Sequence, residues 1–287
     1  LIKLMFLKFR LKRLIERPKK NPLIFLKAFN IFKLKREIFN LFNMQTNFKN
    51  LKLKDQVDIL FYTIKKLKQI NKLGNNNHTK IFSENSLEEF FLKYKNNPDC
   101  EKFTSLFSKY GSDKTISKMS YLYWKIINSL EIKNLFEVGI GTNNILIPSN
   151  MGIDGKPGAS LRAFEEYLKS TNIFGGDIDK NILFKTDRIK TFYIDQLDLE
   201  NLKKIKNIIP KQSLIIDDGL GRPNSNLNMI YTYSDHLEVG GFMVIEHIDP
   251  IFRDVYETCI FNLTKNNNYN AQIIEGHGIT FIIKRLV

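Results

Sequence analysis

The sequence predicts an α/β protein with a doubly wound, mainly parallel seven-stranded sheet. From about residue 112, short runs rich in β-branched and aromatic residues alternate with stretches of helical periodicity. The chain then closes on "NAQIIEGHGITFIIKRL" (270–286), which is typical of a hairpin turning near Gly276–Gly278. Alternating strands and helices form a parallel sheet covered on both faces, and the closing hairpin adds an antiparallel strand.

Each predicted strand is a short apolar run that ends at or next to a glycine or an acidic residue. We expect parallel strands at 134–139, 172–177, 189–194, 213–218 and 241–248. We expect helices at 115–130, 159–170, 180–187, 198–208, 225–237 and 251–264. A further helix at 86–97 begins with Ser86 as its N-cap and Glu89 as the partner in a capping box.

Charge divides the chain into two parts. The formal net charge is +14, and residues 1–77 hold 19 Lys and Arg against 4 Asp and Glu, whereas the remaining residues hold 25 against 26. We therefore expect a basic amphipathic helical region over 1–77, a linker and helix over 78–110, and the sheet domain over 111–287. The two cysteines are too few for a disulfide framework.

The basic region has three interpretations. Amphipathic helices in 1–45, with Leu, Ile and Phe opposite Lys and Arg, would suit a membrane surface. A nucleic-acid-binding arm would suit the charge, but the apolar share of 1–45 is high for a phosphate-binding segment. A helical subdomain or homo-oligomer contact, made basic by an AT-rich genome, explains the same residues. No stretch of about 18 uncharged apolar residues occurs, so we expect a cytoplasmic protein, peripheral at the inner face of the membrane under the first interpretation.

The end of the first strand carries the residues of a ligand site. In a doubly wound sheet, ligands bind beyond the carboxyl ends of the strands, and "NLFEVGIGTNN" (134–144) places Glu137, Gly139 and Gly141 there. Glycine lets the backbone approach a ligand closely. Asp177, at the carboxyl end of the second strand, can accept both hydroxyls of a ribose. In the alternative interpretation, the glycines form only a tight turn and Asp177 caps the next helix.

The pattern does not fit two common nucleotide motifs. A dinucleotide fingerprint requires a third glycine where this chain has Asn144, and a P-loop requires Gly-Lys-Ser/Thr, which "GKPGAS" (155–160) lacks. Glu137 in front of the glycines suits a ligand that carries an ammonium or a sulfonium. These residues together indicate a nucleoside with a positively charged amino-acid tail, S-adenosylmethionine.

About half the chain resembles a known enzyme family. Residues 110–250 resemble class I S-adenosylmethionine-dependent methyltransferases, which have a Rossmann-like fold. Within that class they are most similar to O-methyltransferases of macrolide sugars and polysaccharides, of the mycinamicin sugar methyltransferase type. The matching segments, in order, are "YGSDKT" (110–115), "LFEVGIGT" (135–142), "GASLRAFEEYL" (158–168), "IFGGDID" (173–179), "IDQLD" (194–198), "LIIDDG" (214–219) and "GGFMVIEHI" (240–248).

The resemblance implies a set of cofactor contacts. Ser160 and the amides at the start of its helix would bind the cofactor carboxylate. Asp177 would hold the ribose, and Asp195 and Gln196 would flank the adenine. The implied cofactor-binding residues are Glu137, Gly139, Gly141, Ser160, Asp177, Asp195, Gln196 and Asp217.

The sequence departs from the family pattern at two strand ends. Asp217 and Asp218 would face the transferred methyl group, but the family continues Asp-Asp-Gly-Ser-His, with the histidine as general base. Here the segment is "DDGLG" (217–221), so that histidine is absent. After the fifth strand the family has Glu-Asp, which binds magnesium with the second aspartate, and this chain has Glu246 and His247. An imidazole suits magnesium less well than it suits zinc, iron or manganese.

Two mechanisms follow from these departures. In the first, Asp218, Glu246 and His247 hold a divalent metal (Mg, Mn or Zn) that acidifies the acceptor hydroxyl. In the second, no metal binds and His247 is the general base, its basicity raised by neighbouring carboxylates such as Asp218. The resemblance implies O-methylation of a sugar or glycan-like hydroxyl, in surface polysaccharide or natural-product biosynthesis. The alternatives are a non-catalytic cofactor-binding scaffold and an RNA methyltransferase that uses the basic region.

Overall fold

The structure is a computed structural model that describes residues 80–264 and 267–287. It contains a seven-stranded sheet in the order β3-β2-β1-β4-β5-β7-β6. β1 to β5 run parallel to one another, and β7 runs antiparallel to β5 and β6. The predicted fold class is confirmed. The strands are β1 (Asn134–Val138), β2 (Asn172–Asp177), β3 (Ile189–Tyr193), β4 (Gln212–Asp217), β5 (Leu237–Ile248), β6 (Tyr269–Gly276) and β7 (Gly278–Arg285).

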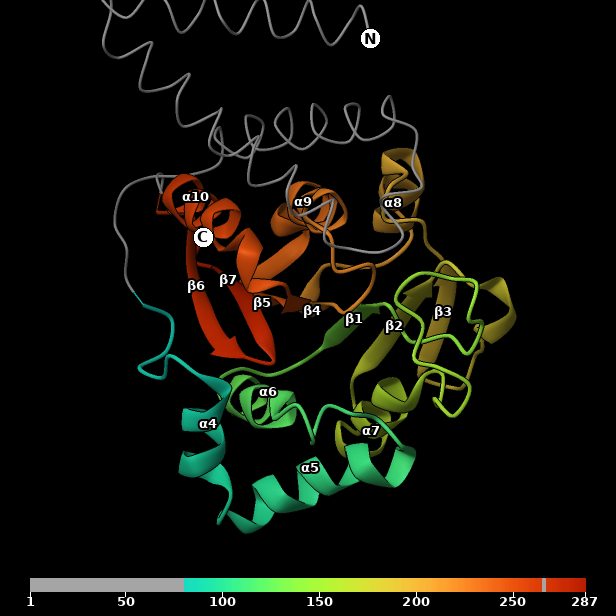
Figure 1. Ribbon diagram of the computed structural model, residues 1–287, viewed down its shortest axis with the longest axis horizontal. Coiled ribbons are helices and arrows are strands. Elements are labelled where there is room, and N and C mark those ends of the chain that lie inside the picture. The colour runs from blue at the N-terminus through green and yellow to red at the C-terminus, as the bar shows by residue number, and fades with distance from the viewer. Residues whose placement is uncertain (1–79, 265–266) are drawn as a thin grey trace, which may run out of the picture. The chain divides into compact units, whose positions relative to one another are not determined.

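Helices cover both faces of the sheet (Figure 1). α4 to α7 lie on one face and α8 to α10 on the other. β1 lies between β2 and β4, and the chain leaves β1 toward α7 but leaves β4 toward α9, on the opposite face. The loops diverge there, so a crevice opens beyond these strand ends. The helices are α4 (Leu87–Tyr94), α5 (Pro98–Tyr110), α6 (Met119–Ile127), α7 (Ala159–Tyr167), α8 (Leu199–Lys206), α9 (Pro223–Tyr233) and α10 (Arg253–Leu263).

Residues 86–111 form two helices, where the sequence analysis expected one. Ser86 caps α4 by accepting from Glu89 N at 3.2 Å, as predicted. The chain then starts α5 with Asn97 as its N-cap, Pro98 in the first turn and Gly111 in a left-handed C-cap. These are strong start and stop signals, and the prediction of a helix over 86–97 merged the end of α4 with the cap of α5.

Three predicted helix boundaries are corrected. The helix expected at 180–187 is only the 3₁₀ turn η2 (Lys180–Ile182). The helix expected at 225–237 ends at Tyr233, and after the turn η3 (Ser234–His236) strand β5 starts four residues earlier than expected. β5 contains Gly240 at a φ of 83° beside a register shift against β4, so a bulge hides the strand's start from its hydrophobic pattern. The last helix is preceded by the turn η4 (Pro250–Phe252).

The core on the α4–α7 side of the sheet is aromatic. Phe103, Phe107 and Phe164 are fully buried, and the rings of Phe107 and Phe164 meet edge to face at 5.1 Å. Phe90 of α4 is equally buried in the same cluster. α4 and α5, which the sequence analysis assigned to a connecting region over 78–110, thus belong to the same packed core as the sheet.

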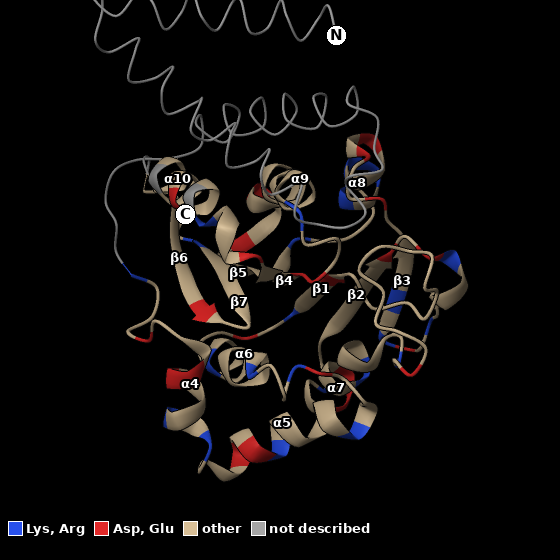
Figure 2. Ribbon diagram, in the orientation of Figure 1, with Lys and Arg blue, Asp and Glu red and all other residues tan. Residues whose placement is uncertain are grey.

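The described residues lack the charge excess of the N-terminal region. Lys and Arg alternate with Asp and Glu over the described helices in Figure 2. The basic helical region predicted over 1–77, and the membrane and oligomer contacts proposed for it, lie outside the described residues. Within the residues that the structure describes, no helix is long and apolar enough to cross a bilayer.

Candidate active site

The loop after β1 passes close to the end of β4. Gly139 and Gly141 have φ angles of 85° and 86°, in the left-handed region that favours glycine. A Cβ on Gly139 would lie 2.2 Å from the carbonyl oxygen of Asp218, and one on Gly141 would lie 2.4 Å from Met151 Sδ. The sequence analysis attributed these glycines to the approach of a ligand, and the structure shows that the chain's own atoms already require them.

A cavity of about 320 Å³, here called the smaller cavity, lies beyond the carboxyl ends of β1, β2 and β4. Its lining includes Leu146, Ile147 and Pro148 from the long loop after β1. The predicted site residues that line it are Gly139, Gly141, Asp177, Asp195, Gln196 and Asp218. The fold therefore brings together, around one cavity, residues from four separate strand ends. Doubly wound sheets bind their ligands at this position.

Asp177 lies at the end of β2 and is only 5% exposed. Its Oδ1 accepts a hydrogen bond from Asp179 N at 3.0 Å. Burial raises the pKa of Asp177, and hydrogen bonds from the amides of Asp179, Gly141 and Ile140 oppose that rise. The cap of η2 is Asp179, which accepts from Asn181 N at 2.9 Å, so Asp177 is not the helix cap of the alternative interpretation.

Asp217 does not line the smaller cavity, and its predicted role beside Asp218 stays a prediction. Its Oδ1 accepts from Gln196 Nε2 at 2.7 Å and its Oδ2 from Asn226 Nδ2 at 2.8 Å. Burial raises the pKa of Asp217 to about 6, against these hydrogen bonds. Successive side chains at a strand end point to opposite sides, so only one of the two aspartates can face the cavity. Gln196 also accepts from Leu220 N at 2.8 Å and so fixes the loop after β4.

Glu137 and Ser160 lie outside the lining of the smaller cavity, and their cofactor contacts remain predictions. Ser160 Oγ donates to Glu137 Oε2 at 2.7 Å. The other oxygen, Oε1, lies 3.2 Å from Lys114 Nζ. Glu137 is therefore engaged by two side chains of the protein, and its carboxylate joins Ser160 of α7 to Lys114.

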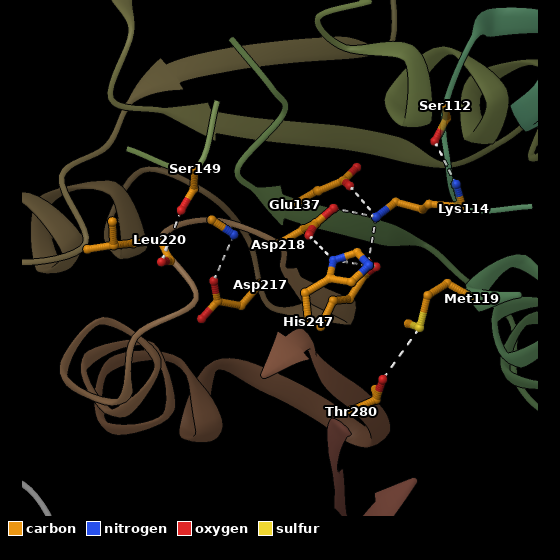
Figure 3. A network of polar contacts seen from close by, with 12 residues as sticks. Ser112, Lys114, Met119, Glu137, Ser149, Asp217, Asp218, Leu220, His247 and Thr280 are labelled. Atoms are coloured by element: carbon orange, nitrogen blue, oxygen red, sulfur yellow. Dashed lines mark hydrogen bonds and ion pairs between the residues drawn. The ribbon is translucent and has the colours of Figure 1, made fainter. Parts of the chain in front are cut away.

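Lys114 is the centre of a charged cluster, and sequence reasoning missed it (Figure 3). Its ammonium donates to Glu246 Oε1 at 2.6 Å and to Asp218 Oδ2 at 2.9 Å. Its side chain is 1% exposed. Tyr123 Oη donates to the same Oε1 of Glu246. In a lysine-rich chain a single lysine gives no signal. The feature that could have pointed to Lys114 is its place in "YGSDKT", a segment that carries the family resemblance.

The cluster holds its charges by mutual pairing. Burial alone would lower the pKa of Lys114, but Asp218, Glu246 and Glu137 outweigh it and raise the pKa well above its ordinary value. Burial likewise favours neutral Asp218, but Lys114 and His247 lower its pKa to about 2. Glu246 is almost fully buried, and its desolvation raises its pKa to about 7 in spite of Lys114. Lys114 and Asp218 are therefore a charged pair at neutral pH.

His247 follows Glu246 near the end of β5 and lies against Asp218. Its Nδ1 is 2.9 Å from Asp218 Oδ1. It adopts a φ of 51°, a left-handed conformation that is unusual for a side-chain-bearing residue and is found at functional sites. The hydrogen bond with Asp218 raises the pKa of His247 to about 9, against burial, which lowers it. The sequence prediction that carboxylates raise the basicity of His247 agrees with this geometry.

His247 also lines a second cavity of about 750 Å³, here called the larger cavity. This cavity lies between α4, the turn before α6 and the tip of the β6–β7 hairpin. His277 from that tip lies across from His247, with ring centroids 6.1 Å apart. The other lining residues include Leu87, Glu88, Asp113, Ile116, Ser117, Lys118 and Glu275. Asp218 lines the smaller cavity and His247 the larger one, so the pair joins the two.

The residues predicted to bind a metal are close together but do not fit a divalent ion well. One ligand atom from each of Asp218, Glu246 and His247 lies within 4.8 Å of the others. However, Lys114 Nζ already contacts both carboxylates, and His247 Nδ1 is bonded to Asp218. Glu246 Oε2 is the one buried carboxylate oxygen of this trio without a partner. The cation in this cluster is the ammonium of Lys114.

Comparisons with known proteins agree with this architecture. No protein-family model matches the sequence, and no curated protein matches it. Among solved structures, the chain is similar to MycE methyltransferase from the mycinamycin biosynthetic pathway in complex with Mg, SAH and mycinamycin VI. The TM-score is 0.51 at 17% identity, over 69% of this chain and 63% of MycE. The chain has the fold of the class I methyltransferases.

A second crystal form of MycE, with Mg and SAH, gives the same TM-score at 16% identity, over 72% of this chain and 62% of that one. The match thus spans less than two thirds of MycE's length. At such low identity the likeness shows the class I methyltransferase fold alone.

Proposed function

We propose that the protein is an S-adenosylmethionine-dependent O-methyltransferase. The smaller cavity would hold the cofactor and the larger cavity the methyl acceptor. The observation that carries this proposal is the Asp218–His247 pair, in which two side chains bonded at 2.9 Å line one cavity each. Methyl transfer requires a sulfonium, an acceptor oxygen and a proton acceptor close together. These three groups can meet at the boundary between the two cavities.

Several features of the smaller cavity suit S-adenosylmethionine. Asp177, at the end of β2, has the position from which an acid binds ribose hydroxyls in doubly wound folds. Ionised Asp218 suits a neighbouring sulfonium, because opposite charges attract strongly where water is excluded. The apolar residues of the loop after β1, together with Ile194 and Leu197, can cover an adenine ring. Solved proteins that share this fold include MycE with SAH bound.

The proposed reaction is a direct displacement. The acceptor oxygen forms a bond to the methyl carbon while the carbon–sulfur bond breaks, and the electron pair stays on sulfur as S-adenosylhomocysteine. The acceptor proton moves to Nε2 of His247, since Nδ1 is bonded to Asp218. The carboxylate of Asp218 then stabilises the imidazolium that forms, and it fixes the ring's orientation beforehand.

His247 must be neutral to accept a proton, although its pKa is raised to about 9 in the free protein. A sulfonium bound beside Asp218 would lower that pKa, because a nearby positive charge disfavours the imidazolium. Binding of the cofactor would thereby help to prepare the base. The carboxylate of Asp218 would thus interact first with the sulfonium of the cofactor and then with the imidazolium of His247.

The larger cavity supports a sugar or glycan-like acceptor. Its lining carries Glu88, Asp113 and Glu275 against Lys118. Carboxylates accept hydrogen bonds from neutral hydroxyl groups but repel the phosphates of RNA. Leu87 and Ile116 add an apolar wall against which a sugar ring can pack. We therefore favour a neutral, hydroxyl-rich acceptor over a polyanion.

Binding of S-adenosylhomocysteine, measured by calorimetry on the full chain, is the first test. We expect one binding site per chain and methyl transfer from radiolabelled S-adenosylmethionine to a panel of sugars and glycans. Absence of binding would contradict the proposal as a whole. Binding without transfer to any hydroxyl acceptor would favour the non-catalytic scaffold, and transfer to RNA would contradict only the acceptor assignment.

A further inference from the structure

We infer that Lys114 is the resident cation of the active-site acid cluster and holds the position that a divalent metal ion would otherwise take. The inference comes from contacts among side chains far apart in the sequence. Lys114 Nζ lies 2.6 Å from Glu246 Oε1, 2.9 Å from Asp218 Oδ2 and 3.2 Å from Glu137 Oε1. One ammonium thus touches three carboxylates from the ends of three different strands.

These distances place the ammonium where a bridging metal would sit. A divalent ion shared by Asp218 and Glu246 would lie about 2.0–2.6 Å from an oxygen of each. Nζ already fills the space between the same two carboxylates. A divalent ion and an ammonium in one cluster would repel each other strongly, since little water is present to screen them. A metal could enter only if Lys114 left.

Lys114 is not free to leave. Its side chain is 1% exposed, and its backbone is held on both sides. Ser120 N donates to the Lys114 carbonyl at 2.9 Å, which ties the turn to the start of α6. Lys114 N donates to Ser112 Oγ at 3.4 Å, and Ser112 N donates to Phe107 O of α5 at 2.8 Å. Withdrawing the side chain would require this turn to open.

The second oxygen of Glu246 is the remaining candidate metal ligand of the cluster. Glu246 Oε2 is buried without a hydrogen-bond partner and lies 4.0 Å from His247 Nδ1. However, the nitrogen that faces it is already bonded to Asp218 Oδ1. Glu246 Oε1 accepts from both Lys114 and Tyr123. A metal at Oε2 would therefore have one available protein ligand, unless the Asp218–His247 bond broke.

Mn²⁺ binding to the full chain tests the inference, read from the electron paramagnetic resonance signal of free Mn²⁺. We expect no stoichiometric binding to the wild-type protein, with or without S-adenosylhomocysteine. Lys114→Ala leaves three carboxylates without their cation, so we expect it to gain one Mn²⁺ site, which Glu246→Gln in the same chain removes again. Lys118→Ala is the matched control: Lys118 lies four residues on, pairs with Glu88 and is 35% exposed, and its loss should create no site.

Thermal unfolding gives a second readout that remains usable when the variant is less stable than the wild type. Added Mn²⁺ should raise the melting temperature of Lys114→Ala and leave that of the wild type unchanged, because only a ligand that binds the native state stabilises it. A wild-type Mn²⁺ site that Glu246→Gln abolishes would overturn the inference. So would a Lys114→Ala protein that Mn²⁺ neither binds nor stabilises.

The metal measurements are independent of the proposed function, since they involve no methyl transfer. What the inference about Lys114 implies for catalysis rests on the proposed function: methyl transfer should proceed at an unchanged rate in the presence of a chelator. If the chain binds S-adenosylhomocysteine and transfers methyl groups only with a divalent ion, the methyltransferase proposal stands and the inference about Lys114 fails. If no transfer is found, the Mn²⁺ titration still decides on Lys114.

Discussion

Asp218 Oδ1 lies 2.9 Å from His247 Nδ1, and the two residues line different cavities. The contact joins the loop after β4 to the end of the neighbouring strand β5. His247 reaches it from a left-handed backbone conformation, with a φ of 51°. Such a conformation costs about 1–3 kcal/mol and persists where the surrounding structure enforces it. The pair is therefore the feature of the fold that most directly suggests chemistry.

Replacing His247 should remove the proton acceptor. We expect His247→Asn to lower kcat by about 10²- to 10⁴-fold, the usual contribution of a general base, while affinity for S-adenosylhomocysteine changes little. His236→Gln is a suitable control, since His236 Nε2 bonds to Ile209 O away from both cavities. Calorimetry and a methyl-transfer assay on the same preparations separate the two effects, and a His247→Asn enzyme with wild-type kcat would refute the assignment.

Activity should rise with pH through the alkaline range. Because the pKa of His247 in the free protein is about 9, the neutral base is scarce at pH 7, and kcat/KM for S-adenosylmethionine, which reports the free enzyme, should increase about tenfold per pH unit up to about pH 9. Asp218→Asn removes the carboxylate that raises this pKa, so its kcat/KM profile should shift to lower pH. A flat profile between pH 7 and 9 would argue against His247 as the base.

The same pKa shift makes stability depend on pH in a defined direction. A histidine whose pKa is higher in the folded than in the unfolded state stabilises the fold fully below its unfolded pKa of about 6.5. That contribution is lost as the pH rises through about 9. Urea unfolding at pH 6 and pH 9.5 should show a smaller loss of stability in His247→Asn than in the wild type.

Asp177 should contribute to cofactor affinity. If it accepts the ribose hydroxyls, Asp177→Asn removes the charge from these hydrogen bonds, and affinity for S-adenosylhomocysteine should fall by at least about tenfold. Asp187→Asn changes an exposed aspartate in the turn before β3 and should leave the affinity unchanged. Equal affinities of the two variants in a calorimetric titration would show that Asp177 does not contact the ligand.

Gly139→Ala should destabilise the fold more than glycine's backbone angle alone explains. Both Gly139 and Gly240 have positive φ angles, of 85° and 83°, which cost a side-chain-bearing residue about 1–2 kcal/mol. A Cβ on Gly240 meets nothing within 4 Å, whereas one on Gly139 would lie 2.2 Å from Asp218 O. We expect Gly139→Ala to lose about 1–3 kcal/mol more than Gly240→Ala in urea unfolding. Equal losses would mean that the loop after β4 moves aside freely.

The parallel strands and their carboxyl ends were accessible from the sequence. Hydrophobic runs of five or six residues and the turn residues between them are local signals, and right-handed connections convert them into a parallel sheet. The ends of those runs placed Gly139, Asp177 and Asp218 at one edge, and the structure gathers these three around the smaller cavity. The helix α5 was missed although its caps are visible, because the predicted helix was carried through to Asn97, the residue that caps α5, and no element was assigned to 98–110.

The pairing of charges behind that edge was decided only by the tertiary structure. Lys114 lies 104 residues from Asp218 and 132 from Glu246, and no local pattern relates them. Whether Asp217 or Asp218 faces the cavity depends on where β4 ends, a matter of one residue. The sequence by itself determined the sheet and the chemical groups at its edge. Packing determined which acids meet a cation and which remain available, because buried charges are stable only beside partners that folding brings from distant segments.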